Sequence, residues 1–214
     1  MSPKLGRTLK GIGLCLLLFV FSGAYEQGDL GSKPRYLGKT AEGWIAELAG
    51  DKARRQMAFD ALVTPRREAT PVLLELLVNQ NASIRCVAAM GLCHIGSKAP
   101  EAIPYLVIAI QDRHLNTRYW AIQALAEHGP VAEAAVPTLV KVLQETFWEV
   151  DPTLDGPKHF YADARAVAAR CLGEIGKGAT PAIPALQEAL TDKSPDVRDA
   201  AAKALLKIER EANK

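Results

Sequence analysis

The sequence predicts an all-α fold, an α-solenoid of about five helical hairpins, and two observations support it. Pro71, Pro104 and Pro137 are each 33 residues apart, and Arg85 and Arg118 have the same spacing. Within each repeat, apolar residues recur at intervals of three and four, which is the spacing of one buried helix face. A fixed period of this length is typical of stacked repeats, in which each unit buries its apolar face against its neighbours.

Residues 1–24 are predicted to be a secretory signal peptide. Three basic residues precede an apolar run at residues 11–21, and Ser22 and Ala24 place small residues before a cleavage point at Tyr25. The uncharged stretch is shorter than the roughly 20 residues that a membrane-spanning helix needs. Cleavage is therefore favoured over an uncleaved anchor, and we expect an exported protein, periplasmic or secreted, that contacts the membrane only if this segment is retained.

The charge balance argues against nucleic-acid binding. The whole chain has 26 Lys and Arg against 24 Asp and Glu, a net charge of +2. Removal of residues 1–24 takes away three basic residues, so the remainder carries 23 − 24 = −1. A dedicated nucleic-acid binder would carry a large basic excess. With 49% hydrophobic but only 6% aromatic residues, the core is expected to be aliphatic.

The solenoid is expected to follow a flexible linker at residues 25–38, where Gly and polar residues dominate, and to cover residues 39–214. Its units are predicted at about 40–64, 65–96, 97–129, 130–176 and 177–210. In the first unit, Trp44 and Leu48 lie on one helical face of a degenerate hairpin that would cap the stack. Gly96, Gly129 and Gly176 are predicted helix ends, just as each repeated proline suits a first helical turn.

The second helices keep small or apolar residues at equivalent positions. One column holds alanine and another leucine, namely Ala88, Ala121, Ala168 and Ala201, then Leu92, Leu125, Leu172 and Leu205. Small residues let neighbouring helices approach closely, and the leucines are expected to fill the layer between hairpins. The last ten residues become increasingly charged, as expected for a terminal unit with one face in water.

These repeats resemble HEAT repeats, particularly the short bacterial type related to phycobilisome-lyase HEAT-like repeats. They share an early proline and a D-x-x-x-x-V-R step, seen most clearly from Asp192 to Val197 and Arg198; Asp112 begins a similar step, whereas Asn79 replaces the acid. The resemblance covers roughly residues 40–210, and its opening stretch, residues 37–62, is similar to the entry segment of secreted bacterial HEAT-repeat proteins. It implies an armadillo-like superhelix whose second helices line a concave, protein-binding surface.

A column of arginines recurs at the start of each second helix, at Arg85, Arg118, Arg165 and Arg198. In HEAT-like repeats such an arginine pairs with an acid of its own or the adjacent unit. We therefore interpret the column as a structural ladder rather than as a basic stripe for nucleic acid.

The fourth unit carries an insertion at 144–163, because Pro137 and Arg165 are 28 residues apart where the equivalent residues of other units are 14 apart. Five acids and four aromatic residues lie in it, the aromatics being Phe147, Trp148, Phe160 and Tyr161. Insertions in solenoids form loops at one edge, where aromatic side chains can anchor a partner. The alternative is that they fold back on the solenoid. The acids lack the ligand pattern of a calcium loop, so no metal site is predicted.

Three residues of the third unit, Tyr119, Ile122 and Gln123, are expected to face the concave groove and to contact a bound peptide. They share columns with Cys86, Ala89 and Met90 in one neighbouring unit and with Ala166, Ala169 and Arg170 in the other. Together with the aromatic residues of the insertion, they are the candidate protein-binding residues.

No catalytic motif and no cofactor-binding motif is found. Cys86, Cys93 and Cys171 lack the spacing of a zinc site or a disulfide framework and are predicted to be packing residues. We predict a non-catalytic exported scaffold that binds a protein of unknown identity through its concave face and the 144–163 loop. The alternative is a lyase-like or accessory enzyme that acts on a cofactor-bearing protein through Cys86 or His94. A nucleic-acid binder similar to HEAT-like DNA glycosylases is disfavoured by charge and export.

Overall fold

The computed structural model describes residues 33–64, 66–145 and 164–213. The chain divides into two compact units, Met1–Lys33 and Pro34–Lys214, and the first contributes only Lys33 to the described residues. The described part is all-α apart from an isolated β-bridge between Tyr36 and Lys39. Within it, none of the helices combines the length and apolar character that crossing a membrane requires.

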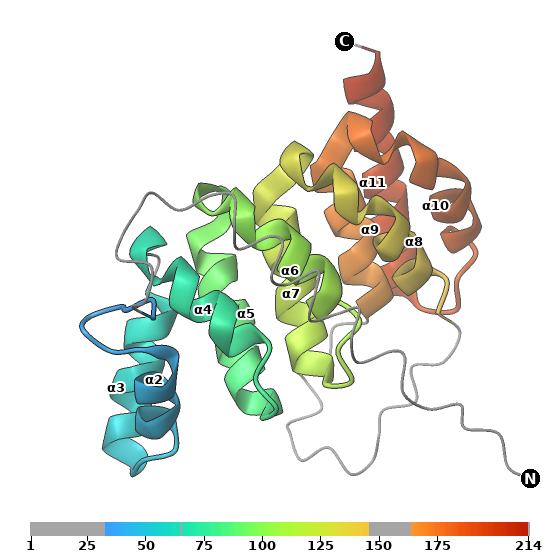
Figure 1. Cartoon of the computed structure of the whole chain (residues 1–214). Coiled ribbons are helices and arrows are strands. Elements are labelled where there is room, and N and C mark those ends of the chain that lie inside the picture. The colour runs from blue at the N-terminus through green and yellow to red at the C-terminus, as the bar shows by residue number, and fades with distance from the viewer. Residues whose placement is uncertain (1–32, 65, 146–163, 214) are drawn as a thin grey trace, which may run out of the picture. The chain divides into compact units, whose positions relative to one another are not determined.

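Ten described α-helices follow one another as five pairs (Figure 1). The pairs are α2 (Ala41–Leu48) with α3 (Lys52–Val63), α4 (Thr70–Leu77) with α5 (Ala82–Ile95), α6 (Ile103–Ala109) with α7 (Leu115–His128), α8 (Val136–Leu143) with α9 (Ala164–Ile175), and α10 (Ile183–Ala189) with α11 (Pro195–Ala212). Short 3₁₀ turns precede α4, α6, α8 and α10. The predicted all-α solenoid of helical hairpins is confirmed.

The second helices form one continuous layer of the stack, since each of them packs against the next, in the order α3, α5, α7, α9 and α11. Each first helix packs mainly against the second helix of its own pair. The core lies between the two layers and is aliphatic, as predicted. Its fully buried leucines include Leu73, Leu106, Leu139 and Leu186 on first helices and Leu92, Leu125 and Leu172 on second helices. Burial of each contributes about 1.5–3 kcal/mol.

Proline and glycine set the helix boundaries where the repeat predicted them. Each of α4, α6, α8 and α10 has its proline in the first turn, where a missing N–H breaks no helical hydrogen bond. Gly96, Gly129 and Gly176 follow the last residues of α5, α7 and α9 with φ of 58°, 58° and 68°. Residues other than glycine are strained at these angles, so each glycine ends its helix and turns the chain.

The segment before α2 belongs to the folded unit. Tyr36 is 4% exposed, its hydroxyl donates to the Ala61 carbonyl at 3.2 Å, and the Trp44 indole donates to the Tyr36 carbonyl at 3.2 Å. The two rings are 5.9 Å apart. The linker predicted up to residue 38 is therefore wrong for residues 34–38, because Tyr36 packs on Trp44 of the first hairpin. The predicted signal peptide and residues 25–32 lie outside the described residues.

Candidate functional site

The arginine column forms a ladder between adjacent units. Its ion pairs join Arg85 to Asp112 at 2.5 Å, Arg118 to Glu145 at 2.6 Å, and Arg165 to Asp192 at 2.5 Å. In each pair the arginine lies in the first turn of a second helix, and the acid follows the first helix of the next unit. The structural interpretation of this column is confirmed for Arg85, Arg118 and Arg165.

The Arg85 rung shows why these pairs are stable. Burial alone would raise the pKa of Asp112, but hydrogen bonds from the Arg85 side chain and the His114 N–H, together with the Arg85 charge, lower it below its ordinary value. The same hydrogen bond raises the pKa of Arg85. Both groups thus stay charged, and their charges are neutralised within the stack rather than offered to a partner.

A second set of side chains lies on the surface of the second helices, at three equivalent positions in each of α5, α7, α9 and α11. We call this surface the second-helix face, and it consists of Cys86, Met90, His94, Tyr119, Gln123, Glu127, Ala166, Arg170, Glu174, Asp199, Lys203 and Lys207. All twelve are half-buried or exposed.

Hydrogen bonds connect Tyr119, Gln123 and Arg170 in a row on the second-helix face. The Gln123 amide donates to the Tyr119 hydroxyl at 3.0 Å, and the Arg170 guanidinium on α9 donates to the Gln123 carbonyl oxygen on α7. The Tyr119 ring packs edge-on against the Trp120 ring, with the centroids 5.3 Å apart. The His94 ring also packs edge-on against Trp120, with the centroids 6.2 Å apart. The row therefore holds a phenol and a guanidinium in defined positions.

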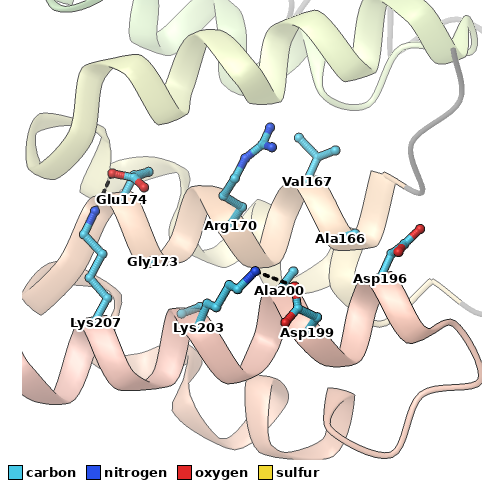
Figure 2. A pocket seen from close by; sticks show the side chains of 11 residues that line it. Ala166, Val167, Arg170, Gly173, Glu174, Asp196, Asp199, Ala200, Lys203 and Lys207 are labelled. Carbon is cyan, nitrogen blue, oxygen red and sulfur yellow. Dashed lines mark hydrogen bonds and ion pairs between the residues drawn. The ribbon is translucent and has the colours of Figure 1, made fainter.

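A groove of about 430 Å³ continues the second-helix face between α9 and α11. Figure 2 shows charged side chains along it, with ion pairs between Glu174 and Lys207 and between Asp199 and Lys203, the latter at 2.6 Å. Its remaining lining is mostly small, with Ala166, Gly173, Ala200 and Ala204. A second hollow of about 750 Å³ reaches the end of α7 and shares Arg170, Glu174 and Lys207 with the first. The two hollows therefore adjoin one another at these charged residues.

The structure separates the three candidate residues of α7. Tyr119 and Gln123 are half-buried and lie on the second-helix face, whereas Ile122 is fully buried, so its expected place in an exposed groove is wrong. Its equivalents Ala89 and Ala169 are also fully buried. Because α7 packs against both α5 and α9, this column faces the interior between units and not the solvent.

The other candidates, Phe147, Trp148, Phe160 and Tyr161, lie outside the described residues. The described chain does show the two ends of the insertion: Glu145 pairs with Arg118, and Arg165 pairs with Asp192. Both ends are thus attached to the ladder.

Arg170 was not among the candidates from the sequence, although it extends the row that Tyr119 and Gln123 begin. The available signal was its column, which holds Met90, Gln123, Arg170 and Lys203 and therefore predicts a surface position. The contact between Arg170 and Gln123 joins residues 47 positions apart across the insertion.

The accessory-enzyme alternative depends on Cys86 or His94. Burial, and then the charge of Asp112, raise the pKa of the Cys86 thiol to about 11, so this thiol is protonated at neutral pH and is a poor nucleophile. The His94 Nδ1 lies 2.7 Å from the Val63 carbonyl oxygen. In the described ranges, no group of three or more His, Cys, Asp and Glu residues is arranged to hold a metal ion.

Comparisons with known proteins agree with this architecture. The sequence matches the family model of HEAT repeats at residues 70–154 and 150–213, which together exceed half of the chain. No curated protein matches it significantly.

Solved structures are similar to this chain in fold. The complex of CpcE and CpcF of phycocyanin lyase from Nostoc sp. PCC7120 has a TM-score of 0.60 and 24% identity, and the match covers 88% of this chain and 71% of that one. An engineered protein from a structural genomics consortium has a TM-score of 0.55 and 23% identity over 80% of each chain. A designed armadillo repeat protein has a TM-score of 0.52 and 16% identity over 78% and 82%.

Proposed function

This chain belongs to the HEAT-repeat family, and from that membership we propose that it is a non-catalytic scaffold that binds another protein through its second-helix face. The repeat fold fits a protein-interaction role, because stacked hairpins form a long surface that is already ordered before a partner arrives. A partner that binds such a surface loses entropy mainly on its own side.

The observation that carries the proposal is the row of Tyr119, Gln123 and Arg170. Tyrosine and arginine are frequent anchors in protein interfaces, since each combines a large contact area with polar groups. Here both side chains are linked through Gln123, so little side-chain entropy remains to be lost on binding. The adjoining groove between α9 and α11 provides depth for a segment of the partner.

The 144–163 loop is the second part of the proposed binding surface. Its four aromatic residues would supply apolar anchors for a partner, and this part of the proposal rests on the composition of the insertion.

Site-specific crosslinking from the second-helix face tests the proposal. A photoreactive residue replaces Glu127, an exposed residue of the second-helix face that leaves the row of Tyr119, Gln123 and Arg170 intact, and the matched control places it at Lys141, an exposed residue of the first helix α8. In an extracytoplasmic extract of the native host, the proposal requires that the Glu127 probe captures one protein that the Lys141 probe does not. Arg170→Glu in the Glu127-probe background should abolish that capture. Equal capture from both positions would argue against the second-helix face.

The loop is tested separately, by replacing residues 146–161 with a short Gly-Ser linker. Retained capture by this variant would restrict the binding surface to the second-helix face. Loss of capture, with an unchanged melting temperature, would support the loop as part of the surface.

Export is a further part of the proposal and rests on the basic start and apolar run of residues 1–24. N-terminal sequencing of the protein from the extracytoplasmic fraction should give Tyr25 as the first residue. A mature chain that begins at Met1 and fractionates with membranes would indicate an uncleaved anchor instead.

A further inference from the structure

Two leucines of the fifth unit are more exposed than their equivalents in the fourth unit. Leu206 on α11 is 69% exposed, whereas its equivalent Gly173 is buried against α11. Leu190, at the end of α10, is 40% exposed, whereas its equivalents Ile110 and Leu143 are buried. The described residues of the fifth unit thus present an apolar surface that fits another helix.

Arg198 occupies the ladder column but has a different set of partners. Its guanidinium donates to the carbonyl oxygens of Asp192 and Lys193 at 2.7 and 3.0 Å, just as Arg85 donates to two carbonyls of its own loop. Arg85 also donates to both carboxylate oxygens of Asp112. Among the described residues, Arg198 has no corresponding carboxylate, so an acid from outside the unit would complete the ladder.

One stripe of α11 combines these features. Arg198, Ala202, Leu206 and Glu209 are spaced by four, four and three residues and therefore lie on one face of the helix. Three of the four side chains are exposed, and Ala202 is half-buried. We call this stripe the end stripe. The helix that carries it has 18 residues and is about 27 Å long.

The end stripe is complementary to itself when a second copy runs in the opposite direction. Arg198 and Glu209 are centred between residues 203 and 204, and Ala202 and Leu206 are centred at residue 204. A single two-fold axis near this point therefore brings Arg198 opposite the partner subunit's Glu209 and Leu206 opposite the partner subunit's Ala202. Each contact occurs twice, as a two-fold interface requires.

We propose that this protein forms an antiparallel homodimer in which the α11 helices of two copies pack through their end stripes. The two Arg198 guanidinium groups then acquire the carboxylates that the ladder supplies elsewhere, and the two Leu206 side chains are removed from water. A contact made mainly by one helix per subunit is small, so the dimer is weak. The contact does not involve the second-helix face of α5, α7 and α9.

Sedimentation velocity of the full-length chain tests the dimer. Measurements between about 1 μM and about 500 μM cover weak association, and the sedimentation coefficient should rise over this range from that of a monomer to that of a dimer. Arg198→Glu alone and Glu209→Arg alone each place like charges opposite one another, and each variant should stay monomeric. Glu127→Arg, the same charge reversal at an exposed residue of α7, should leave dimerisation unchanged.

An equimolar mixture of the two charge variants gives the decisive result. In the mixed dimer, the glutamate introduced at position 198 faces the arginine introduced at position 209, and the native Glu209 faces the native Arg198. The mixture should therefore dimerise although neither variant does so alone. Melting temperatures of both variants show that they are folded.

Leu206→Glu is a second variant that does not depend on Arg198 and its loop contacts. Since Leu206 is exposed, this change should leave the melting temperature unchanged and abolish the dimer. A native chain that stays monomeric over the whole concentration range would overturn the proposal. So would a dimer that survives Leu206→Glu, or a mixture of folded charge variants that stays monomeric.

Discussion

Arg85 on α5 donates two hydrogen bonds to Asp112 in the next unit, from Nε to Oδ2 at 2.5 Å and from Nη2 to Oδ1 at 2.8 Å. The arginine also donates to the carbonyls of Asn79 and Gln80, both at 2.8 Å. One guanidinium thus closes the turn of its own hairpin and binds the turn of the next. This double role explains why the arginine recurs with the repeat period.

We expect Asp112→Asn to lower the free energy of unfolding by about 1–3 kcal/mol, because the amide keeps the size of the side chain but leaves the half-buried Arg85 charge without its counter-ion. Urea unfolding followed by circular dichroism measures the change. The matched control is Lys203→Ala, which breaks an ion pair whose side chains are 74% and 65% exposed. That pair should contribute less than about 1 kcal/mol. Equal effects of the two substitutions would contradict a special role for the ladder.

The same rung predicts a pH dependence. The folded pKa of Asp112 is lowered relative to its unfolded value of about 3.9, so its ion pair stabilises the fold fully above that pH. This stability is lost as the pH falls through the folded pKa. The difference in unfolding free energy between the native chain and Asp112→Asn should therefore be constant near neutral pH and shrink below about pH 4. A difference that is independent of pH down to 2 would exclude this origin.

Gly91 lies where α5 approaches the backbone of α3 in the preceding unit closely. A Cβ atom there would lie 2.5 Å from the Leu62 carbonyl oxygen and 3.0 Å from the Leu73 methyl groups. Gly91→Ala should therefore cost about 1–3 kcal/mol, because backbone cannot move aside as a flexible side chain can. Gly43→Ala in α2 is the control, since its nearest neighbour is the Lys39 side chain at 3.3 Å. It should change stability by at most about 1 kcal/mol. Thermal unfolding compares the two.

Tyr36 is expected to close the N-terminal end of the stack. Tyr36→Ala removes a buried ring from the Trp44 indole and should cost about 3 kcal/mol, whereas Tyr36→Phe loses only the hydrogen bond to Ala61 and should cost about 1 kcal/mol. Denaturant midpoints at equal slope distinguish the two effects. If both variants unfold like the native chain, residues 34–38 do not contribute to the folded unit.

The thiols of the stack should react slowly while it is folded. Burial is the main cause that raises the pKa of Cys86 to about 11 and that of Cys93 to about 12. At pH 8, this shift leaves roughly a hundredfold less thiolate at Cys86 than at an exposed cysteine. Labelling with a thiol-reactive reagent should therefore be slow without denaturant and fast with it. Fast labelling of Cys86 in the folded chain would instead favour the accessory-enzyme alternative.

The helix boundaries could be predicted from the sequence because they depend on short-range rules. Proline suits a first helical turn, and glycine alone adopts the positive φ at the end of α5, α7 and α9. The arginine ladder was predicted from the resemblance to HEAT repeats, and the structure shows that the acid belongs to the next unit. The alanine and leucine columns predicted the aliphatic layer between hairpins, because residues at equivalent positions of each second helix face the neighbouring helix.

The candidate site was predicted only in part. Tyr119 and Gln123 lie on the second-helix face, but Ile122 is buried. The reason is that α7 packs against both α5 and α9, so more of its circumference is covered than the spacing of its apolar residues predicted. Tyr36 was predicted to lie in the linker because no helical spacing of apolar residues surrounds it, yet its ring is buried against Trp44.

The sequence by itself thus determined the fold class and the hairpin boundaries, which follow from the repeat period and from local backbone preferences, whereas the role of the arginine column was predicted from the resemblance to HEAT repeats. Only the tertiary structure decided which side chains meet across units, such as Arg170 with Gln123, and which positions of α11 remain uncovered. The physical reason is that a helical period specifies the direction of each side chain around its own axis. The depth and angle at which two helices pack decide what that side chain touches.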